Sequence, residues 1–197
     1  MRTSTILLLA ACPLCSSAQL LSPPALDSVR TFRSMEKALE RPDQVYRLDL
    51  SHQKLKEVPE QVFLLINLNA LDLGRNKLKD LPGRLADLPY LQELRAPRNR
   101  MGSFPEVICR MSHLKRLDLS RNALDGLPVC LGDLKELVSL DLWSNDLARF
   151  PVELEGLKAL RFMDLRAIQF SQEEMERITE LLPWVKIHFS QPCNCGM

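Results

Sequence analysis

The strongest constraint on the fold is a repeat with a period of 23 residues. Single asparagines recur at that spacing, and prolines recur at the same spacing six residues after each asparagine position. Self-similarity at a fixed period of about 20 to 50 residues is the sequence signature of stacked repeat architectures. The asparagines are Asn76, Asn99, Asn122 and Asn145, and the prolines are Pro59, Pro82, Pro105, Pro128 and Pro151.

Each unit also repeats a set of apolar positions that a single unit is too small to enclose. Stacked neighbours bury such residues in one continuous interior, so the stability of the array comes from interfaces between adjacent units. Five complete units cover residues 45–159, and a sixth begins at Leu160 and diverges after Phe170. In the fourth unit the apolar positions are Leu114, Leu117, Leu119, Leu124, Leu127, Leu131 and Leu134.

The residues of each unit also indicate where its strand lies. The short Leu-x-Leu element predicts one parallel strand per unit, with neighbouring strands about 4.8 Å apart, and the Leu-Pro-x-x-Leu half predicts the return along the opposite side. The expected fold is therefore an α/β solenoid with a right-handed curvature and parallel strands on its concave face.

The unit LKRLDLSRNALDGLPVCLGDLKE at residues 114–136 resembles the leucine-rich-repeat family in its 23-residue form, L-x-x-L-x-L-x-x-N-x-L-x-x-L-P-x-x-L-x-x-L-x-x. The resemblance covers residues 45–170. It implies a non-catalytic module that binds a protein, or alternatively a glycan. The family includes both intracellular scaffolds and exported bacterial proteins, so the resemblance alone does not give the location.

The four asparagines have a structural interpretation. Each follows a strand, where a turn leaves backbone groups without partners, and a side-chain amide can both donate to and accept from such groups. We therefore expect Asn76, Asn99, Asn122 and Asn145 to form a structural ladder.

Both ends of the array have residues suited to covering an exposed apolar layer. Over residues 19–44, apolar residues at helical spacing predict one amphipathic cap helix that stops at Pro42. Over residues 171–189, Ser171 and Glu174 form a capping-box pattern that predicts a helix, followed by a half-buried closing strand. Residues 190–197 are expected to form a loose tail.

Residues 1–18 combine Arg2, an apolar run and small residues at Ser16 and Ala18, a pattern typical of a cleaved export signal. This favours the exported kind of repeat protein, located in the periplasm, at the cell surface or outside the cell. The alternative is lipid attachment at Cys12, which would make the chain an anchored structural component of the envelope. No transmembrane segment is expected, because no later stretch stays free of charges for the required length.

The residues between the strand leucines should point away from the core and carry the function. One column holds Asp72, Asp118 and Asp141, with Arg95 between Asp72 and Asp118. A second column, three residues further along the chain, holds Arg75, Arg98 and Arg121. One interpretation is a solvated lattice of salt bridges, and the other is electrostatic docking of a protein. Calcium binding by the aspartates is a third alternative, although one carboxylate per strand supplies few ligands. No cofactor is expected.

Two aromatic residues, Trp143 and Phe162, occupy outward strand positions. Trp143 is a candidate anchor for a partner, or alternatively a cover for the stem of a neighbouring arginine. The third unit departs from the pattern at Ala96 and Pro97, and because proline cannot donate a ladder hydrogen bond we expect local distortion there.

Cys109 and Cys130 lie at nearly equivalent positions in adjacent return segments, so a disulfide is geometrically feasible, with two separate thiols as the alternative. Cys193 and Cys195 form a weak C-x-C signal. No catalytic motif is present, and the net charge of +1 argues against binding to nucleic acid. The sequence thus predicts a monomeric, non-enzymatic protein-binding module.

Overall fold

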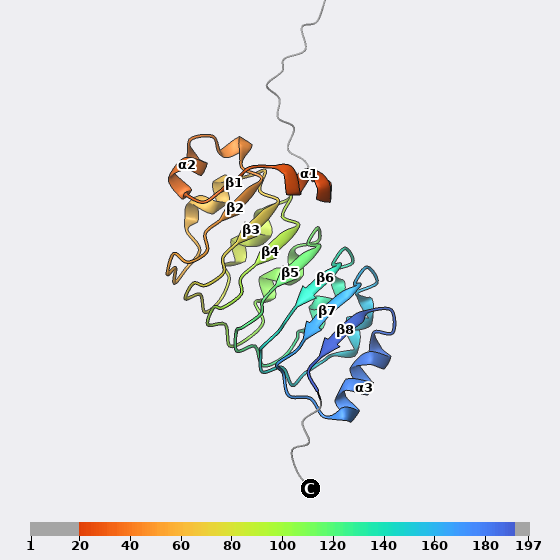
Figure 1. The fold of residues 1–197 in the computed structure, drawn as a ribbon. Helices are drawn as coiled ribbons and strands as arrows, with labels where there is room; N and C mark the ends of the chain where they lie inside the picture. The colour runs from red at the N-terminus through yellow and green to blue at the C-terminus, as the bar shows by residue number, and fades with distance from the viewer. Residues whose placement is uncertain (1–19, 192–197) are drawn as a thin grey trace, which may run out of the picture.

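Parallel strands follow one another in chain order across a single open sheet (Figure 1). The computed structural model describes residues 20–191, and within them every strand pairs with the strand of the next unit. This arrangement confirms the predicted α/β leucine-rich-repeat solenoid. The strands are β1 (Thr31–Phe32), β2 (Arg47–Asp49), β3 (Ala70–Asp72), β4 (Glu93–Arg95), β5 (Arg116–Asp118), β6 (Ser139–Asp141), β7 (Phe162–Leu165) and β8 (Lys186–Phe189).

The return half of each complete unit forms a short 3₁₀ helix on the opposite side from the strands (Figure 1). Each helix starts directly after the repeated proline, which occupies the N-cap position and whose fixed φ restricts the backbone there. The helices are η2 (Glu60–Leu64), η3 (Gly83–Asp87), η4 (Glu106–Arg110), η5 (Val129–Asp133) and η6 (Val152–Gly156).

The leucines of successive units form one continuous interior. The strand residues Leu48, Leu71, Leu94, Leu117 and Leu140 are paired in register across the sheet, and each is at most 2% exposed. Full burial of one such side chain contributes about 1.5–3 kcal/mol. The same buried cluster extends from Ala38 to Leu182 without a break, so the units share a single core.

The repeated asparagines connect each unit to the one before it. Asn122 Oδ1 accepts a hydrogen bond from the backbone N–H of Met101 at 3.2 Å. Its Nδ2 donates to the carbonyl of Leu119 at 2.9 Å and to that of Ala96 at 3.1 Å. Equivalent bonds are made by Asn76, Asn99 and Asn145.

The prediction of one cap helix over residues 19–44 is wrong. That segment contains α1 (Pro23–Ser28), β1, α2 (Met35–Leu39) and the 3₁₀ helix η1 (Pro42–Gln44). The helical spacing is interrupted because Thr31 and Phe32 pair with Arg47 and Leu48, which gives the first edge of the sheet its backbone partner.

The two short helices of this segment have different places. Ala38 of α2 belongs to the buried core, and Phe32 and Met35 pack against it, so these residues cover the first apolar layer. The segment containing α1 instead lies along the edge where the strands begin (Figure 1), and Leu26 is buried there outside the main cluster.

The other end is closed by α3 (Gln172–Leu181) and β8. Ser171 Oγ accepts a hydrogen bond from the N–H of Glu174, and the Glu174 carboxylate accepts one from the N–H of Ser171. Strand β8 pairs with β7, and Phe189 packs edge to face on Phe170. The last repeat is thereby covered.

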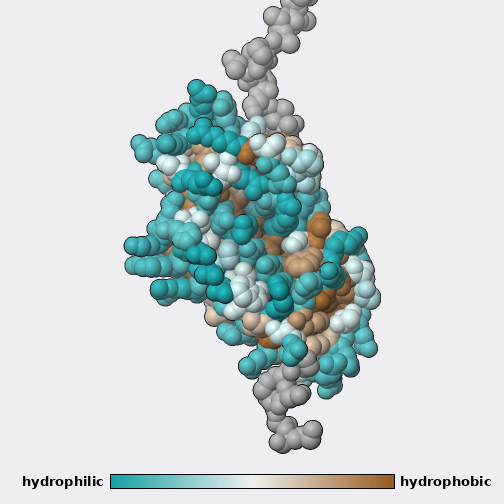
Figure 2. Space-filling model, viewed as in Figure 1, coloured by the Kyte–Doolittle hydropathy of each residue, from teal (hydrophilic) through white to brown (hydrophobic). Residues whose placement is uncertain are grey.

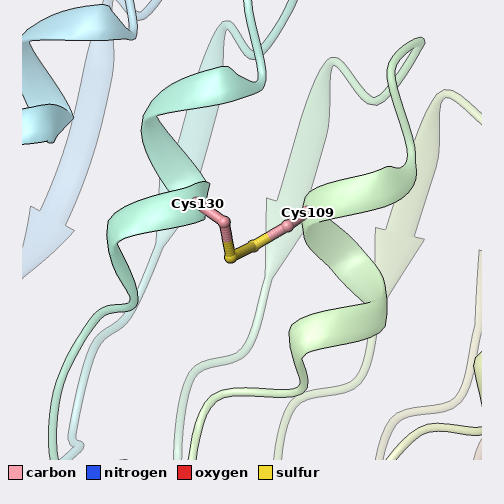
Figure 3. Close-up of a disulfide and its surroundings, with 2 residues drawn as sticks. All are labelled: Cys109 and Cys130. Atoms are coloured by element: carbon pink, nitrogen blue, oxygen red, sulfur yellow. A yellow bond between two sulfur atoms is a disulfide. The ribbon is translucent and has the colours of Figure 1, made fainter.

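A disulfide joins the 3₁₀ helices of the third and fourth units (Figure 3). Cys109 in η4 and Cys130 in η5 are bonded, with their Cα atoms 5.6 Å apart. The bridge lies on the side of the solenoid opposite the strands, so it ties adjacent units without occupying the sheet.

Several predictions concern residues outside the described range. These are the export signal over residues 1–18 with the alternative lipid site Cys12, and the pair Cys193 and Cys195. Within residues 20–191, no helix has the length and apolar character needed to cross a bilayer.

Candidate functional site

The side chains that alternate with the buried strand residues form three columns along the sheet, which we call the concave face. The strand register places each residue of the first two columns beside its counterpart in the next unit, and the third column follows two residues after the second. The first column is Arg47, Ala70, Glu93, Arg116, Ser139 and Phe162; the second is Asp49, Asp72, Arg95, Asp118, Asp141 and Asp164; the third is Ser51, Gly74, Pro97, Ser120, Trp143 and Arg166.

The aspartates of the second column have a structural role that the sequence reasoning missed. The carboxylate of Asp118 accepts hydrogen bonds from the backbone N–H and the hydroxyl of Ser120. In the next unit Asp141 accepts from the N–H of Trp143 at 3.0 Å. The same bond is made by Asp49, Asp72 and Asp164 to residues 51, 74 and 166. Each aspartate therefore fixes the turn that follows its own strand.

Arg95 replaces an aspartate in this column and links its neighbours. Its guanidinium lies 3.5 Å from Asp72 Oδ2 and 3.4 Å from Asp118 Oδ2. The structure thus brings Arg95 and Asp118 together, as the predicted salt-bridge lattice requires. Because the Arg95 side chain remains 57% exposed, these pairs add at most about 1 kcal/mol each to stability.

The expected distortion at Pro97 does not occur. Strands β4 and β5 keep the regular register, and Arg98 N–H still donates to the carbonyl of Ser120. In the other units the N–H at the position of Pro97 bonds to the aspartate of the same unit, not to the neighbouring strand. A proline at this position therefore removes no ladder bond.

The aspartates near the end of the sheet are in different electrostatic states. Burial raises the pKa of the Asp141 carboxyl, against the hydrogen bond from Trp143 N–H, and the charges of Asp118 and Asp164 raise it further. Asp164 is also affected by burial, but hydrogen bonds and charge from Arg166 outweigh it and hold the pKa below its usual value. Within residues 20–191, Asp141 has no cation within ion-pair distance.

Trp143 lies against a neighbouring arginine, a contact that the alternative prediction for this residue included. Its side chain is half-buried, and the Arg121 guanidinium lies 4.1 Å from the centre of its ring. Phe162 is also half-buried and packs edge to face on His188 at 5.1 Å. The space-filling view shows hydrophobic surface gathered over β6–β8, whereas the rest of this face is mostly hydrophilic (Figure 2).

A column of exposed arginines follows the strand ends. Arg75, Arg98 and Arg121 occupy the same position in successive units, each with a left-handed backbone at φ of 54° to 55°. The N–H of each donates to a carbonyl of the next unit, so the three backbones are held in register. The charges of Arg121 and Arg75 lower the pKa of the Arg98 guanidinium.

The N-terminal segment occupies the opposite edge of the sheet, a contact that the sequence reasoning did not anticipate. Leu21 N–H donates to Asn69 Oδ1 at 2.9 Å, and Gln92 Nε2 donates to the carbonyl of Leu21 at 2.8 Å. Arg47 donates to the carbonyl of Leu26 and also pairs with the buried Glu93. The available signal in the sequence was the pair of amide residues, Asn69 and Gln92, that directly precede β3 and β4. The part of the face nearest the starts of β2–β4 is therefore covered by the chain itself.

The aspartate column provides no cage for calcium. Within residues 20–191, no group of three or more His, Cys, Asp or Glu side chains is placed to hold a metal ion. The Oδ1 atoms of Asp118, Asp141 and Asp164 each accept a backbone N–H, which engages one oxygen of every carboxylate.

These features define a class: a solenoid of stacked units whose sheet carries columns of side chains that the core does not use. The family model described as "Leucine-rich repeat region" matches residues 44–187. The chain therefore belongs to the leucine-rich-repeat family. Proteins of this fold commonly serve as interaction modules.

Solved structures give the same fold. A leucine-rich-repeat protein of Leptospira interrogans is 31% identical with a TM-score of 0.65, covering 83% of this chain and 48% of its own length. Internalin C2 of Listeria monocytogenes is 23% identical with a TM-score of 0.62, covering 75% and 62%. A further Listeria monocytogenes internalin, InlF, is 20% identical with a TM-score of 0.58, covering 82% and 54%. The chain thus spans less than two thirds of each of these structures. No curated protein matches the sequence.

Proposed function

We propose that this chain is a non-catalytic protein-binding module that works outside the cytoplasm and docks its partner on the concave face. The observation that carries the proposal is the sorting of side chains in each strand. Residues at the leucine positions are buried, whereas the third column changes from Ser51 and Gly74 to Trp143 and Arg166 while the register stays the same. The fold does not determine the side chains of this column, so they are free to be chosen for contact with a partner.

The best anchor on this face is Trp143. A large aromatic side chain that keeps part of its surface exposed can bury that surface against a partner, and such residues dominate binding energy in many interfaces. Asp141 beside it keeps a half-buried carboxylate without an ion-pair partner in the described chain, and Arg98 presents an exposed cation. Apolar and charged contacts of both signs are therefore available to a protein partner.

A location outside the cytoplasm is supported by the disulfide between Cys109 and Cys130, because disulfides persist in oxidising compartments. The predicted signal at residues 1–18 points the same way. Thiol quantification on protein purified from its native source under alkylating conditions tests this part: protected cysteines at 109 and 130 support it, and free thiols at both contradict it.

The binding proposal is tested by affinity capture from an extracellular or envelope extract of the source organism, with quantitative mass spectrometry of the bound proteins. The test variant is Trp143→Ala combined with Arg98→Glu. The matched control is Val152→Ala combined with Lys79→Glu, which makes one apolar truncation and one charge reversal at exposed residues away from the concave face. Partners retained by wild type and control but lost by the test variant support the proposal. Equal retention by all three forms, or capture that depends on glycans alone, overturns it.

A further inference from the structure

We propose that Arg75, Arg98 and Arg121 form a docking track for an acidic, extended segment of a protein partner. This inference rests on the proposed use of the concave face and specifies the chemistry of what binds at one edge of it.

The three guanidinium groups are exposed, and within residues 20–191 none of them forms an ion pair with a carboxylate. By contrast, Arg95, three residues before Arg98, forms ion pairs with Asp72 and Asp118 on the same sheet. Arg121 lies over the ring of Trp143, 4.1 Å from its centre, as a cation–π partner. The track therefore keeps its positive charge available.

The backbone at these positions does not require arginine. A left-handed φ near 55° is adopted most readily by glycine or asparagine, whereas a residue with a long side chain pays a conformational cost there. The equivalent positions in other units are His52, Ser144 and Ala167, so the fold accepts several side chains. Arginine occurs at this position in three successive units, although the backbone conformation disfavours it and the like charges repel one another. This indicates a role for the arginine side chains themselves.

The geometry favours a narrow acidic peptide over a polyanion. The backbones that carry the cations are held one strand apart, about 4.8 Å per step, because each backbone N–H donates to the adjacent unit. The aspartate column runs three residues upstream in each unit and lies alongside the track. A nucleic acid or sulfated glycan is wide and uniformly negative, and would meet these carboxylates, whereas an extended peptide can place its acidic side chains on the arginines alone. The overall charge of +1 gives no general field for polyanions.

The test measures binding of a fluorescent 12-residue polyglutamate peptide by anisotropy at several salt concentrations. We expect binding that weakens as salt rises, a loss of affinity of at least tenfold in the triple variant Arg75→Glu, Arg98→Glu, Arg121→Glu, and retention of most of it in the triple Arg→Lys variant. The matched control is Lys56→Glu, Lys79→Glu, Arg41→Glu, which changes the net charge equally at exposed cations away from the track. Thermal unfolding of every variant verifies that the fold is kept.

Three outcomes overturn the proposal: no binding of the peptide by wild type at low salt, an equal loss in the control triple, or track-dependent binding of a heparin oligosaccharide but not of the peptide. The affinity-capture experiment separates this inference from the proposed function when it is repeated with Trp143→Ala alone and with the arginine triple, because the double variant used there also changes the track residue Arg98. If captured partners are lost with Trp143→Ala but kept with the arginine triple, the concave-face proposal stands and the acidic track fails. If neither variant loses them, the concave-face proposal itself fails.

A second readout uses Arg98→Gly, which removes one charge and relaxes the backbone. The expected result is weaker peptide binding with an unfolding midpoint equal to or above that of wild type. Unchanged peptide binding would contradict the role assigned to the side chain.

Discussion

The third and fourth units have the same strand register and the same asparagine bonds, yet they differ at three consecutive positions, the last residue of the strand and the two residues after it. The fourth unit has Asp118, with its carboxylate bonded to the Ser120 N–H. The third has Arg95 and Pro97 at the equivalent positions, so the acceptor and the donor are both absent. Because the two changes occur together, neither leaves an unsatisfied group. The concave face can therefore reverse its charge in one unit while the fold beneath it stays intact.

The two units also differ in the core, where Ala96 stands at the position of Leu119. Both residues are fully buried. The second and fifth units, which flank this pair of units, have leucine at the same position, Leu73 and Leu142. The smaller side chain in the third unit is accompanied by Met101 in place of the leucine that the fourth unit has at Leu124. A flexible methionine can fill irregular space next to a small residue. The core thus tolerates alanine only with its own local packing.

The largest expected effect tests that conclusion by moving the alanine to the fourth unit. Leu119→Ala should lower the free energy of unfolding by about 2–5 kcal/mol, because it leaves a cavity between Ala96 and Leu142 in a unit that has Leu124 in place of the flexible Met101. Urea denaturation followed by circular dichroism measures the change, and Val152→Ala at an exposed site serves as the control. A loss below about 1 kcal/mol would show that alanine fits the fourth unit as well as the third.

The second prediction concerns the bond that ties the two units together. Asn122→Ala should cost about 1–3 kcal/mol, because the N–H of Met101 loses its acceptor, whereas the carbonyls of Ala96 and Leu119 keep their bonds from Asn99 and Asn145. Denaturant titration against the exposed Ser103→Ala control measures it. A near-neutral result would mean that water replaces the amide at this position.

The third prediction separates the coupled pair on the concave face. Arg95→Asp alone should destabilise by about 1–2 kcal/mol, because it adds a carboxylate between Asp72 and Asp118 with no N–H to accept from. Pro97→Ser restores that N–H, so the double variant should recover about 0.5–1.5 kcal/mol relative to additive single changes. A double-mutant cycle in urea measures the coupling, and additivity would show that the two positions are independent.

The sequence predicted the repeat-based parts of the molecule well and the non-repeating parts poorly. A pattern that is repeated several times predicts the leucine interior, the strand positions and the asparagine bonds. Such a pattern is very unlike a spacing that arises by chance. The N-terminal cap appears only once, and there the helical spacing of Val29, Phe32 and Met35 was outweighed by pairing of Phe32 with Leu48, a contact distant in the chain. A local pattern of apolar residues does not show which distant segment will pair with them.

On the candidate site, the sequence placed Arg95 between Asp72 and Asp118, as the structure shows. It did not reveal that the aspartates bond to the N–H two residues later, although the joint replacement at Arg95 and Pro97 was a visible signal for it. The stacking of Arg121 on Trp143 depends on side-chain conformation, which spacing alone does not specify. The role of Trp143 in binding a partner stays a prediction.

The smallest expected effect extends the comparison to the fifth unit, where Asp141 forms no ion pair within residues 20–191, although the charge of Arg166 acts to lower its pKa. Burial raises the pKa of this carboxyl and the charges of Asp118 and Asp164 add to the rise, so the ionised form is disfavoured in the folded protein. Its ionisation therefore costs stability as the pH rises above the unfolded value of about 3.9. Asn keeps an acceptor for the Trp143 N–H, so Asp141→Asn should raise the free energy of unfolding at pH 7, by less than about 1 kcal/mol.

The gain from Asp141→Asn should shrink as the pH falls toward 3, because the wild-type carboxyl is then protonated in both states. Asp164→Asn is the matched control with the opposite sign. Burial alone would raise the pKa of Asp164, but hydrogen bonds and charge from Arg166 outweigh it, so the ionised form stabilises the fold and that stability is lost as the pH falls through the lowered pKa. Asp164→Asn should therefore weaken the protein most near neutrality. Unfolding curves at pH 3, 5 and 7 compare the two variants, and parallel pH profiles would contradict the distinction between a carboxylate paired with an arginine and a carboxylate without an ion pair.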